Sequence, residues 1–211
     1  MKYFLIIILL IFMALTNQLQ AKQYKVAILI YDGVYLLDFA GPLEIFNDAM
    51  INEKSAAFEC YLVSPEGKSI TAHTGTIVTP QYSFIDSPQP DILVIPGGNL
   101  GLASKNKDVA NWIINTSEKT LITMSVCTGA FILADLGLLN GKEATTWFGA
   151  KSKLQKKYPN IKVVDKRITD NGKIITTAGV SAGIDGALYI VEKLFGKEIS
   201  DKTAKYVEWE K

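Results

Sequence analysis

Short continuous runs of apolar residues alternate along the chain with segments whose apolar residues recur at helical spacing. Runs of aliphatic and β-branched residues, such as YKVAILIY at 24–31, are typical of strands buried on both faces of a sheet. The pattern predicts strands at 24–31, 58–64, 91–95, 120–126, 162–168 and 173–177. It predicts helices at 38–50, 109–117, 128–136, 150–158, 181–195 and 199–209, the first with Pro42 in its first turn.

The alternation of strands and helices predicts the fold class. An α/β chain of this kind forms a single-domain three-layer sandwich, in which helices cover both faces of a mostly parallel sheet. Asp170-Asn171-Gly172 lies between the last two predicted strands and predicts a small antiparallel hairpin. Residues 70–80 are rich in Thr, Val and Ile around Gly75, which predicts short irregular strands. No repeat or linker interrupts residues 22–211, so we expect one domain there.

Residues 1–21 have a different pattern from the rest of the chain. Lys2 precedes an apolar run at 4–15, which is too short to cross a bilayer comfortably as a helix, and a polar stretch then leads to the small residue Ala21. This pattern predicts a signal peptide over 1–21 and a periplasmic or secreted mature protein, with no stable membrane insertion after cleavage. The alternative is a protein anchored in the membrane by an uncleaved N-terminal segment.

Charge and histidine content narrow the function classes. The chain has 22 Lys and Arg, 21 Asp and Glu, and a single histidine, His73. Nucleic-acid binding needs clustered positive charge, so this balance disfavours a nucleic-acid partner. One histidine rules out a multi-histidine metal site, and we expect neither a metal nor another cofactor. His73 lies in the irregular 70–80 region, where a surface or packing role is commoner than a catalytic one.

One motif carries candidate chemistry: Ser125-Val126-Cys127-Thr128-Gly129, which follows a predicted strand and opens a predicted helix. A nucleophile held in a strained strand-to-helix turn needs small residues two positions away on each side. The helix start would supply free N–H groups and partial positive charge, which favour a thiolate at Cys127. The alternative is an inert cysteine buried at a strand end. We interpret the second cysteine, Cys60, as a core residue and expect no disulfide.

Ordered segments between about residues 24 and 209 carry a resemblance to a known family. They are Asp38-Phe39-Ala40-Gly41-Pro42, Pro96-Gly97-Gly98, Cys127-Thr128-Gly129-Ala130, Gly137-Leu138-Leu139-Asn140-Gly141, Ala144-Thr145-Thr146 and Ser181-Ala182-Gly183-Ile184-Asp185. In this order the chain resembles the DJ-1/PfpI superfamily, which has the flavodoxin-like, class I glutamine amidotransferase-like fold. Within that superfamily the segments are most similar to the isonitrile hydratase branch and to the sensor domains of AraC-type regulators.

The resemblance implies roles for the residues at matching positions. Cys127 would be the nucleophile, and Asp38 the acidic residue whose carboxyl group reaches its sulfur. The backbone N–H groups of Gly98 and Thr128, with Gly97 beside them, would form an oxyanion-hole-like pocket for substrate. Thr128 would also orient substrate or water. From the residues alone, Asp38 can also be a helix N-cap, and the two roles are compatible. The resemblance further implies a homodimer.

Two positions depart from relatives in the superfamily. Trp147 stands where regulator-like relatives carry a histidine, and Thr128 where protease members do. A Cys–His amidase or protease is therefore disfavoured, because it lacks the base that activates the thiol and protonates a leaving amine. Isonitrile hydration does not need such a base, because the isonitrile carbon is electrophilic and no amine leaves as the thioimidate forms. A carboxyl group beside a thiolate retains a shared proton, so Cys127 and Asp38 suffice.

We therefore expect an exported, cysteine-dependent hydratase that converts a small-molecule isonitrile to an N-formamide. The alternatives are a non-catalytic small-molecule sensor and a redox or stress-protective protein in which Cys127 is oxidised. A cysteine hydrolase is less favoured. The chain ends at Lys211, shortly after the last predicted helix, so we expect no DNA-binding module of the kind that follows the sensor domains.

Overall fold

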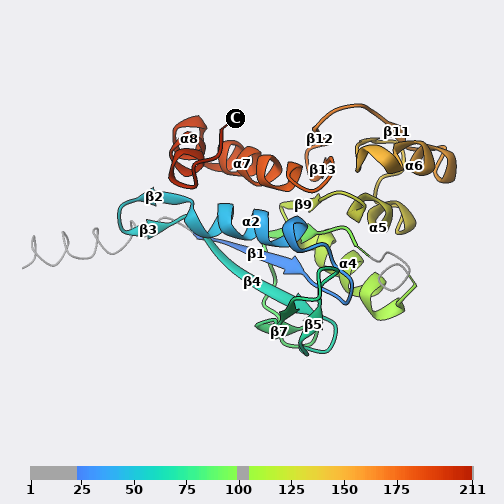
Figure 1. Ribbon diagram of the computed structural model, residues 1–211, viewed down its shortest axis with the longest axis horizontal. Helices are drawn as coiled ribbons and strands as arrows, with labels where there is room; N and C mark the ends of the chain where they lie inside the picture. Colours follow the sequence, from blue (N-terminus) through green and yellow to red (C-terminus); the bar gives the residue numbers. More distant parts are fainter. Residues whose placement is uncertain (1–22, 99–104, 211) are drawn as a thin grey trace, which may run out of the picture.

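The computed structural model describes residues 23–98 and 105–210, which fold around a sheet with the strand order β12-β13-β9-β8-β1-β4-β7 (Figure 1). The strands are β1 (Tyr24–Leu29), β4 (Phe58–Ser64), β7 (Tyr82–Ser83), β8 (Ile92–Ile95), β9 (Ile122–Ser125), β12 (Ile168–Asp170) and β13 (Ile174–Thr177). Every neighbouring pair is parallel except β12–β13, which is the antiparallel hairpin that the sequence predicts. The predicted mostly parallel sheet is therefore confirmed.

Helices cover both faces of this sheet. They are α2 (Leu36–Asp48), α4 (Lys107–Lys119), α5 (Gly129–Asp135), α6 (Lys151–Lys157), α7 (Ala182–Phe195) and α8 (Lys197–Tyr206). The crossover from β1 to β4 runs along the sheet in one direction and the crossover from β8 to β9 in the other. Because such crossovers are right-handed, α2 and α4 lie on opposite faces. Helix α7 packs beside α2.

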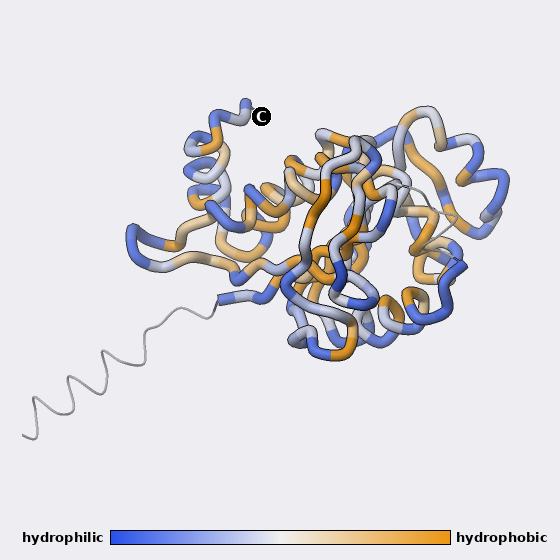
Figure 2. The backbone as a smooth tube through the Cα atoms, turned by 60° about the horizontal axis from the view of Figure 1, so that its bottom comes forward, coloured by the Kyte–Doolittle hydropathy of each residue, from blue (hydrophilic) through white to orange (hydrophobic). Residues whose placement is uncertain are grey.

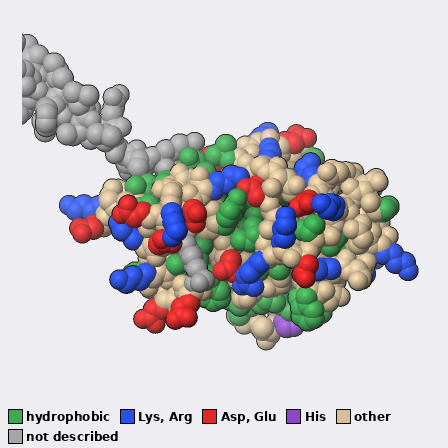
Figure 3. Space-filling model, turned by 90° about the horizontal axis from the view of Figure 1, so that it is seen from above, with side chains coloured by type: hydrophobic (Ala, Val, Ile, Leu, Met, Phe, Trp, Pro, Cys, Tyr) green, Lys and Arg blue, Asp and Glu red, His purple; other side chains and the backbone are tan. Residues whose placement is uncertain are grey.

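The core is the part of the sheet where the sequence has its continuous apolar runs. Residues 26–29 of β1 and 92–95 of β8 are completely buried between the two helical layers. Hydrophobic stretches of the chain gather in the middle of the molecule, whereas hydrophilic stretches lie mainly at its periphery (Figure 2). Lys and Arg side chains lie among Asp and Glu side chains on the face shown in Figure 3. Within the described residues, no helix is long and apolar enough to cross a membrane.

Short elements account for most differences from the predicted pattern. The 70–80 region forms the predicted short strands, β5 (Ile70–Thr71) and β6 (Ile77–Val78), around Gly75. The hairpin of β2 (Met50–Asn52) and β3 (Ser55–Ala56) was not predicted. The single strand predicted at 162–168 is wrong, because β11 (Lys162–Val163) pairs with β10 (Glu143–Ala144) and β12 begins only at Ile168. A short 3-10 helix, η1 (Phe148–Ala150), precedes α6. The predicted signal peptide, 1–21, lies outside the described residues.

The start of α2 also differs from the prediction, and the difference places a candidate site residue. Helix α2 begins at Leu36, so Pro42 lies inside the helix and not in its first turn. Proline has no N–H to donate to the carbonyl group four residues earlier, which is that of Asp38. Asp38 itself lies in the first turn of the helix.

Candidate functional site

Cys127 lies in a sharp turn between β9 and α5, as the motif spacing predicts. Its backbone has a φ of +57°, in the left-handed region that few non-glycine residues adopt. Its N–H donates to the carbonyl oxygen of Ala178 at 3.0 Å. At Gly129, a Cβ would lie 2.1 Å from the carbonyl oxygen of Ile95, so only glycine fits there. The turn directs the chain away from the sheet, yet the Cys127 side chain is only 3% exposed.

The carboxyl group of Asp38 lies beside this sulfur. Asp38 is completely buried, and its Oδ2 accepts the N–H of Gly97 at 3.0 Å. Its Oδ1 is also buried and has no hydrogen-bond partner among the described residues. The position before the first turn of α2 is Tyr35, so Asp38 is not the N-cap. That reading of Asp38 is wrong, because its carboxyl group points to Gly97 and Cys127 instead of the helix start.

Burial sets the protonation of this pair. It raises the pKa of Asp38 to about 7, against the opposing effects of the Gly97 N–H and the Cys127 thiol. Burial, followed by the charge of the Asp38 carboxylate, raises the pKa of Cys127 to about 11, although the N–H groups of Val180 and Thr128 act in the other direction. The expectation that Cys127 favours a thiolate is therefore wrong, because burial outweighs the N–H groups. At neutral pH the pair holds at least one shared proton.

Gly97, Gly98 and Thr128, expected to bind substrate, lie together next to this pair. The N–H of Gly98 donates to Thr128 Oγ1 at 3.2 Å. A Cβ at Gly97 would lie 2.6 Å from Thr128 Oγ1 and 2.8 Å from Asp38 Oδ2, so glycine keeps this space open. The Thr128 N–H faces the Cys127 sulfur. A substrate that accepts the Gly98 N–H would therefore take the place of the Thr128 hydroxyl group in this hydrogen bond. The oxyanion-hole role of Gly98 and Thr128 stays a prediction.

Val180 belongs to the site, although the sequence does not predict it. It lies between β13 and α7 with a φ of +48°, which is rare and strained for a β-branched residue. Its N–H faces the Cys127 sulfur and lowers the pKa of the thiol. The neighbouring Ser181-Ala182-Gly183 segment belongs to the family resemblance, but no local pattern marks Val180 itself, because the strain exists only in the folded chain.

Two hydroxyl groups complete the surroundings of the cysteine. Tyr31 is buried, and its hydroxyl group donates to the carbonyl oxygen of Pro96 at 3.0 Å. Burial raises its pKa strongly, and the charges of Asp38 and Cys127 raise it further. Thr146 Oγ1 donates to the carbonyl oxygen of Cys127 at 2.7 Å. Neither residue was predicted as part of the site.

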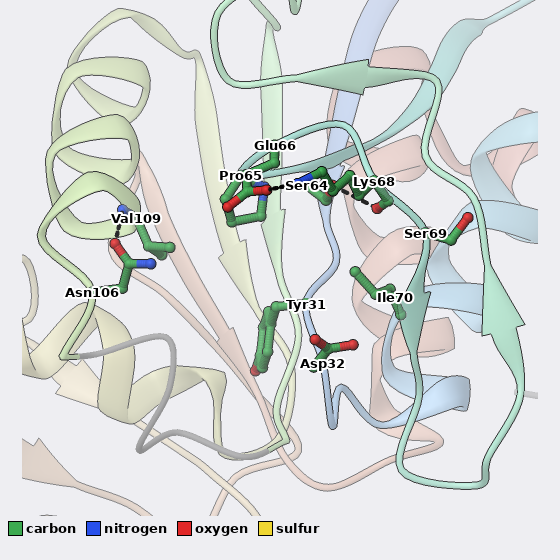
Figure 4. A pocket seen from close by; sticks show the side chains of 10 residues that line it. All are labelled: Tyr31, Asp32, Ser64, Pro65, Glu66, Lys68, Ser69, Ile70, Asn106 and Val109. Carbon is green, nitrogen blue, oxygen red and sulfur yellow. Dashed lines mark hydrogen bonds and ion pairs between the residues drawn. The ribbon is translucent and has the colours of Figure 1, made fainter.

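Tyr31 also forms part of the wall of a separate cavity. This cavity measures about 320 Å³, and Ser64, Pro65, Asn106 and Val109 are among the residues around it (Figure 4). The cysteine and the carboxyl group of the candidate site do not line it.

The aromatic residue at the expected histidine position packs beside the site. The indole ring of Trp147 lies against Gly179 and Gly149, where a Cβ would come within 2.5 Å of the ring. The only imidazole of the chain, that of His73, is exposed and stacks on the ring of Tyr35, with ring centroids 4.3 Å apart. Among the described residues His73 makes no hydrogen bond to Cys127.

Two further expectations concern the cysteines and metals. Cys60 and Cys127 are both free thiols in the structure. Residues 23–98 and 105–210 contain no group of three or more His, Cys, Asp or Glu side chains that could hold a metal ion.

Comparison with known proteins decides the family. The model of the DJ-1/PfpI family matches residues 24–193. The chain belongs to the DJ-1/PfpI family. Isonitrile hydratase from Pseudomonas putida is 29% identical over 186 residues, which cover 88% of this chain and 78% of that protein. HTH-type transcriptional regulators from Pseudomonas aeruginosa are also relatives. The resemblance seen in the sequence motifs is thereby confirmed.

Solved structures agree with the family assignment. A ThiJ/PfpI family protein from Pseudomonas syringae superposes with a TM-score of 0.81 at 25% identity, covering 91% of this chain and 77% of that one. DJ-1beta from Drosophila melanogaster superposes with a TM-score of 0.79 at 20% identity, covering 90% and 100%. These likenesses confirm the predicted flavodoxin-like fold.

Proposed function

We propose that this DJ-1/PfpI family protein is an exported, cysteine-dependent isonitrile hydratase, which adds water to an isonitrile and releases an N-formamide. One observation carries the proposal. The buried Asp38 carboxyl group, with a pKa of about 7 and an Oδ1 atom that has no hydrogen-bond partner among the described residues, lies beside the Cys127 thiol. The similarity to an isonitrile hydratase along most of both chains supports the same chemistry.

In the first step the Cys127 sulfur bonds to the isonitrile carbon. The thiol gives up its proton to the Asp38 carboxylate as the S–C bond forms, so no free thiolate has to persist. One carbon–nitrogen π pair moves onto nitrogen, and the lone pair of the carbon takes the proton from Asp38. The product is a thioimidate, R–N=CH–S, on Cys127, and the carboxylate is regenerated.

In the second step water adds to the thioimidate carbon. Asp38 accepts a proton from the water molecule as the C–O bond forms. One water proton ends on nitrogen, and the other returns to sulfur when the C–S bond breaks. The N-formamide leaves, and Cys127 is a thiol again. No step expels an amine, which is why a site without an imidazole group can complete the cycle.

The other groups of the site hold the reacting atoms in place. The N–H groups of Val180 and Thr128 stabilise negative charge on the sulfur as the S–C bond forms and breaks. The Gly97 N–H fixes one oxygen of Asp38, which leaves Oδ1 for proton transfer. Burial of the pair excludes bulk water, which strengthens these interactions.

The direct test is conversion of simple alkyl and aryl isonitriles to formamides by the mature protein, residues 22–211. Cys127→Ser is the background control. We expect formamide to form with the wild-type protein alone. An absence of conversion across the panel would defeat the proposal.

A sensor or redox role would then be favoured, since transcriptional regulators and DJ-1 proteins are among the relatives. Ligand binding without turnover would indicate a sensor. Oxidation of Cys127 by mild peroxide, detected by mass spectrometry, would indicate a redox protein.

Two further parts of the proposal concern the state of the protein in the cell. We expect cleavage after Ala21, because an apolar run at 4–15 and a small residue precede that bond. N-terminal sequencing of extracytoplasmic protein should begin at Lys22, and an intact chain retained in the membrane would indicate the anchored alternative. We expect a homodimer, which light scattering of the mature protein tests.

A further inference from the structure

Arg167 is the only arginine in the sequence, and it ties together three segments near the site. Its Nε donates to Asp185 Oδ2 at 2.5 Å, and its Nη2 donates to Ser181 Oγ at 3.2 Å. The other oxygen of Asp185, Oδ1, accepts the indole N–H of Trp209 at 2.9 Å. We call Arg167, Asp185 and Trp209 the α7 clamp, because they join the first turn of α7 to the residue before β12 and to the C-terminal segment.

Two short chains of contacts connect the residues of the α7 clamp with Cys127. Ser181, which accepts from Arg167, directly follows Val180, and the Val180 N–H faces the Cys127 sulfur. The carbonyl oxygen of Arg167 accepts the N–H of Ala178 at 2.8 Å, and the carbonyl oxygen of Ala178 accepts the N–H of Cys127 at 3.0 Å. Both sets of contacts therefore fix the short segment at 178–181, which supplies the Val180 N–H to the sulfur and accepts the Cys127 backbone N–H.

The strained backbone of Val180 needs such a constraint. A β-branched residue at a φ of +48° persists only where the surrounding structure holds it. A side-chain cap at the start of α7 does not hold the Val180 backbone in place, since the Ser181 side chain makes no capping hydrogen bond. The side-chain hydrogen bonds of Arg167 to Ser181 and Asp185 tie this helix start to the residue before β12, in addition to the backbone bond from the Gly183 N–H to the carbonyl oxygen of Val180.

We propose that the α7 clamp positions the Val180 N–H against the Cys127 sulfur and thereby sets the reactivity of that thiol. Its three residues act through Val180 and touch no reacting atom. The charged group that acts on the thiol is the Asp38 carboxylate, whereas the charge of Cys127 in turn raises the pKa of Tyr31. The inference rests on Cys127 as the nucleophile of the proposed function, but it does not depend on which substrate is used.

The test is the rate of Cys127 alkylation by iodoacetamide as a function of pH, in a Cys60→Ser background. We expect Asp185→Asn to slow alkylation at pH 8 about tenfold and to move the pH profile upward, because a thiolate that loses an N–H donor forms less readily. Arg167→Lys keeps the positive charge but cannot make the hydrogen bonds to Asp185 and Ser181 at the same time. It should therefore slow alkylation as well. Trp209→Phe should have a smaller effect in the same direction. If Asp185→Asn does not fold, the alkylation profiles of Arg167→Lys and Trp209→Phe decide the outcome.

A second ion pair on the same helix provides a matched control. Lys193, near the other end of α7, pairs with Asp170, and the side-chain exposures of 33% and 19% compare with 52% and 20% for Arg167 and Asp185. Lys193→Gln should leave the alkylation profile unchanged. Wild-type profiles in all the clamp variants would overturn the inference, as would equal slowing by Lys193→Gln. Alkylation uses no isonitrile. The alkylation rates therefore still test the role of the α7 clamp if the protein converts no isonitrile.

Discussion

The two cysteines of the chain belong to the same sheet but have different surroundings. Cys60 lies within β4, where burial, followed by the charge of Glu59, raises its pKa to about 12. Cys127 lies just beyond β9, and burial raises its pKa to about 11. The two thiols therefore differ little in acidity. What separates them is that Cys127 sits in a left-handed turn, next to the Asp38 carboxyl group and the Val180 N–H.

In the proposed reaction, Cys127 acts as a nucleophile without being an acidic thiol. Cys60 pairs with Val26 of β1 inside the sheet, and the nearest charge that acts on its thiol, that of Glu59, raises its pKa. Cys127 has a carboxyl group whose pKa of about 7 suits proton transfer near neutral pH.

The largest effect should come from removing the two sulfurs in turn. Cys127→Ser should lose essentially all isonitrile turnover, because a hydroxyl group is a much poorer nucleophile than a thiol at this site. Cys60→Ser should retain turnover close to wild type. Steady-state formamide production measures both, and equal losses in the two variants would remove the contrast.

Removing the proton carrier should have the next largest effect. Asp38→Asn keeps the shape of the side chain and an acceptor for the Gly97 N–H. It should lose turnover about a hundredfold, the usual scale for a positioned acid or base, while Cys127 is still alkylated. Turnover that survives in Asp38→Asn would show that another group carries the proton.

The pH dependence of kcat/KM should show the two ionisations of the pair. The active form holds one proton, so activity should rise as pH increases through about 7, where the doubly protonated pair loses its first proton. It should fall as pH approaches about 11, where the second proton leaves. At two pH units below the lower pKa the rate should be about a hundredfold lower. A profile that is flat from pH 5 to pH 9 would contradict a shared proton.

Alkylation compares the two thiols without any substrate. Cys127 should react several-fold faster than Cys60 near neutral pH, because the Asp38 carboxyl group beside it can accept the thiol proton and the Val180 N–H stabilises charge on the sulfur. Peptide mass spectrometry after a short iodoacetamide pulse measures both sites in one sample. Equal rates would show that the turn at Cys127 gives it no advantage.

The smallest effect is expected at the single imidazole. His73→Ala should change turnover little, because His73 is exposed and stacks on Tyr35 outside the Cys127–Asp38 pair. Kinetics of this variant beside wild type measure the difference. A large loss would point to a Cys–His hydrolase with a geometry that this structure does not have.

Local patterns predicted much of the fold and the turn that holds Cys127. Continuous apolar runs mark the central strands, and Asp170-Asn171-Gly172 marks the hairpin, because both depend on neighbouring residues alone. The small residues around Cys127 predicted its turn for the same reason. Asp38 was found only through the family resemblance, since nothing in its own neighbourhood shows that its carboxyl group faces a thiol.

Features that depend on distant segments were not predicted. The burial of Cys127 and the strain at Val180 arise when the turn after β13 packs on the turn after β9. The helix containing Asp38 begins before the position that Pro42 suggested, because tertiary packing outweighs a positional preference. The strand predicted at 162–168 is interrupted for the same reason. Lys162 and Val163 pair with the short strand β10, which lies outside the main sheet.

The most direct test of the central claim is to find the bond between Cys127 and the substrate. Wild-type protein mixed with an isonitrile and quenched within one turnover should gain the mass of one isonitrile molecule, on the peptide that contains Cys127. The adduct should be absent from Cys127→Ser and from the Cys60 peptide. Formamide that accumulates while Cys127 stays unmodified throughout the first turnover would contradict the account.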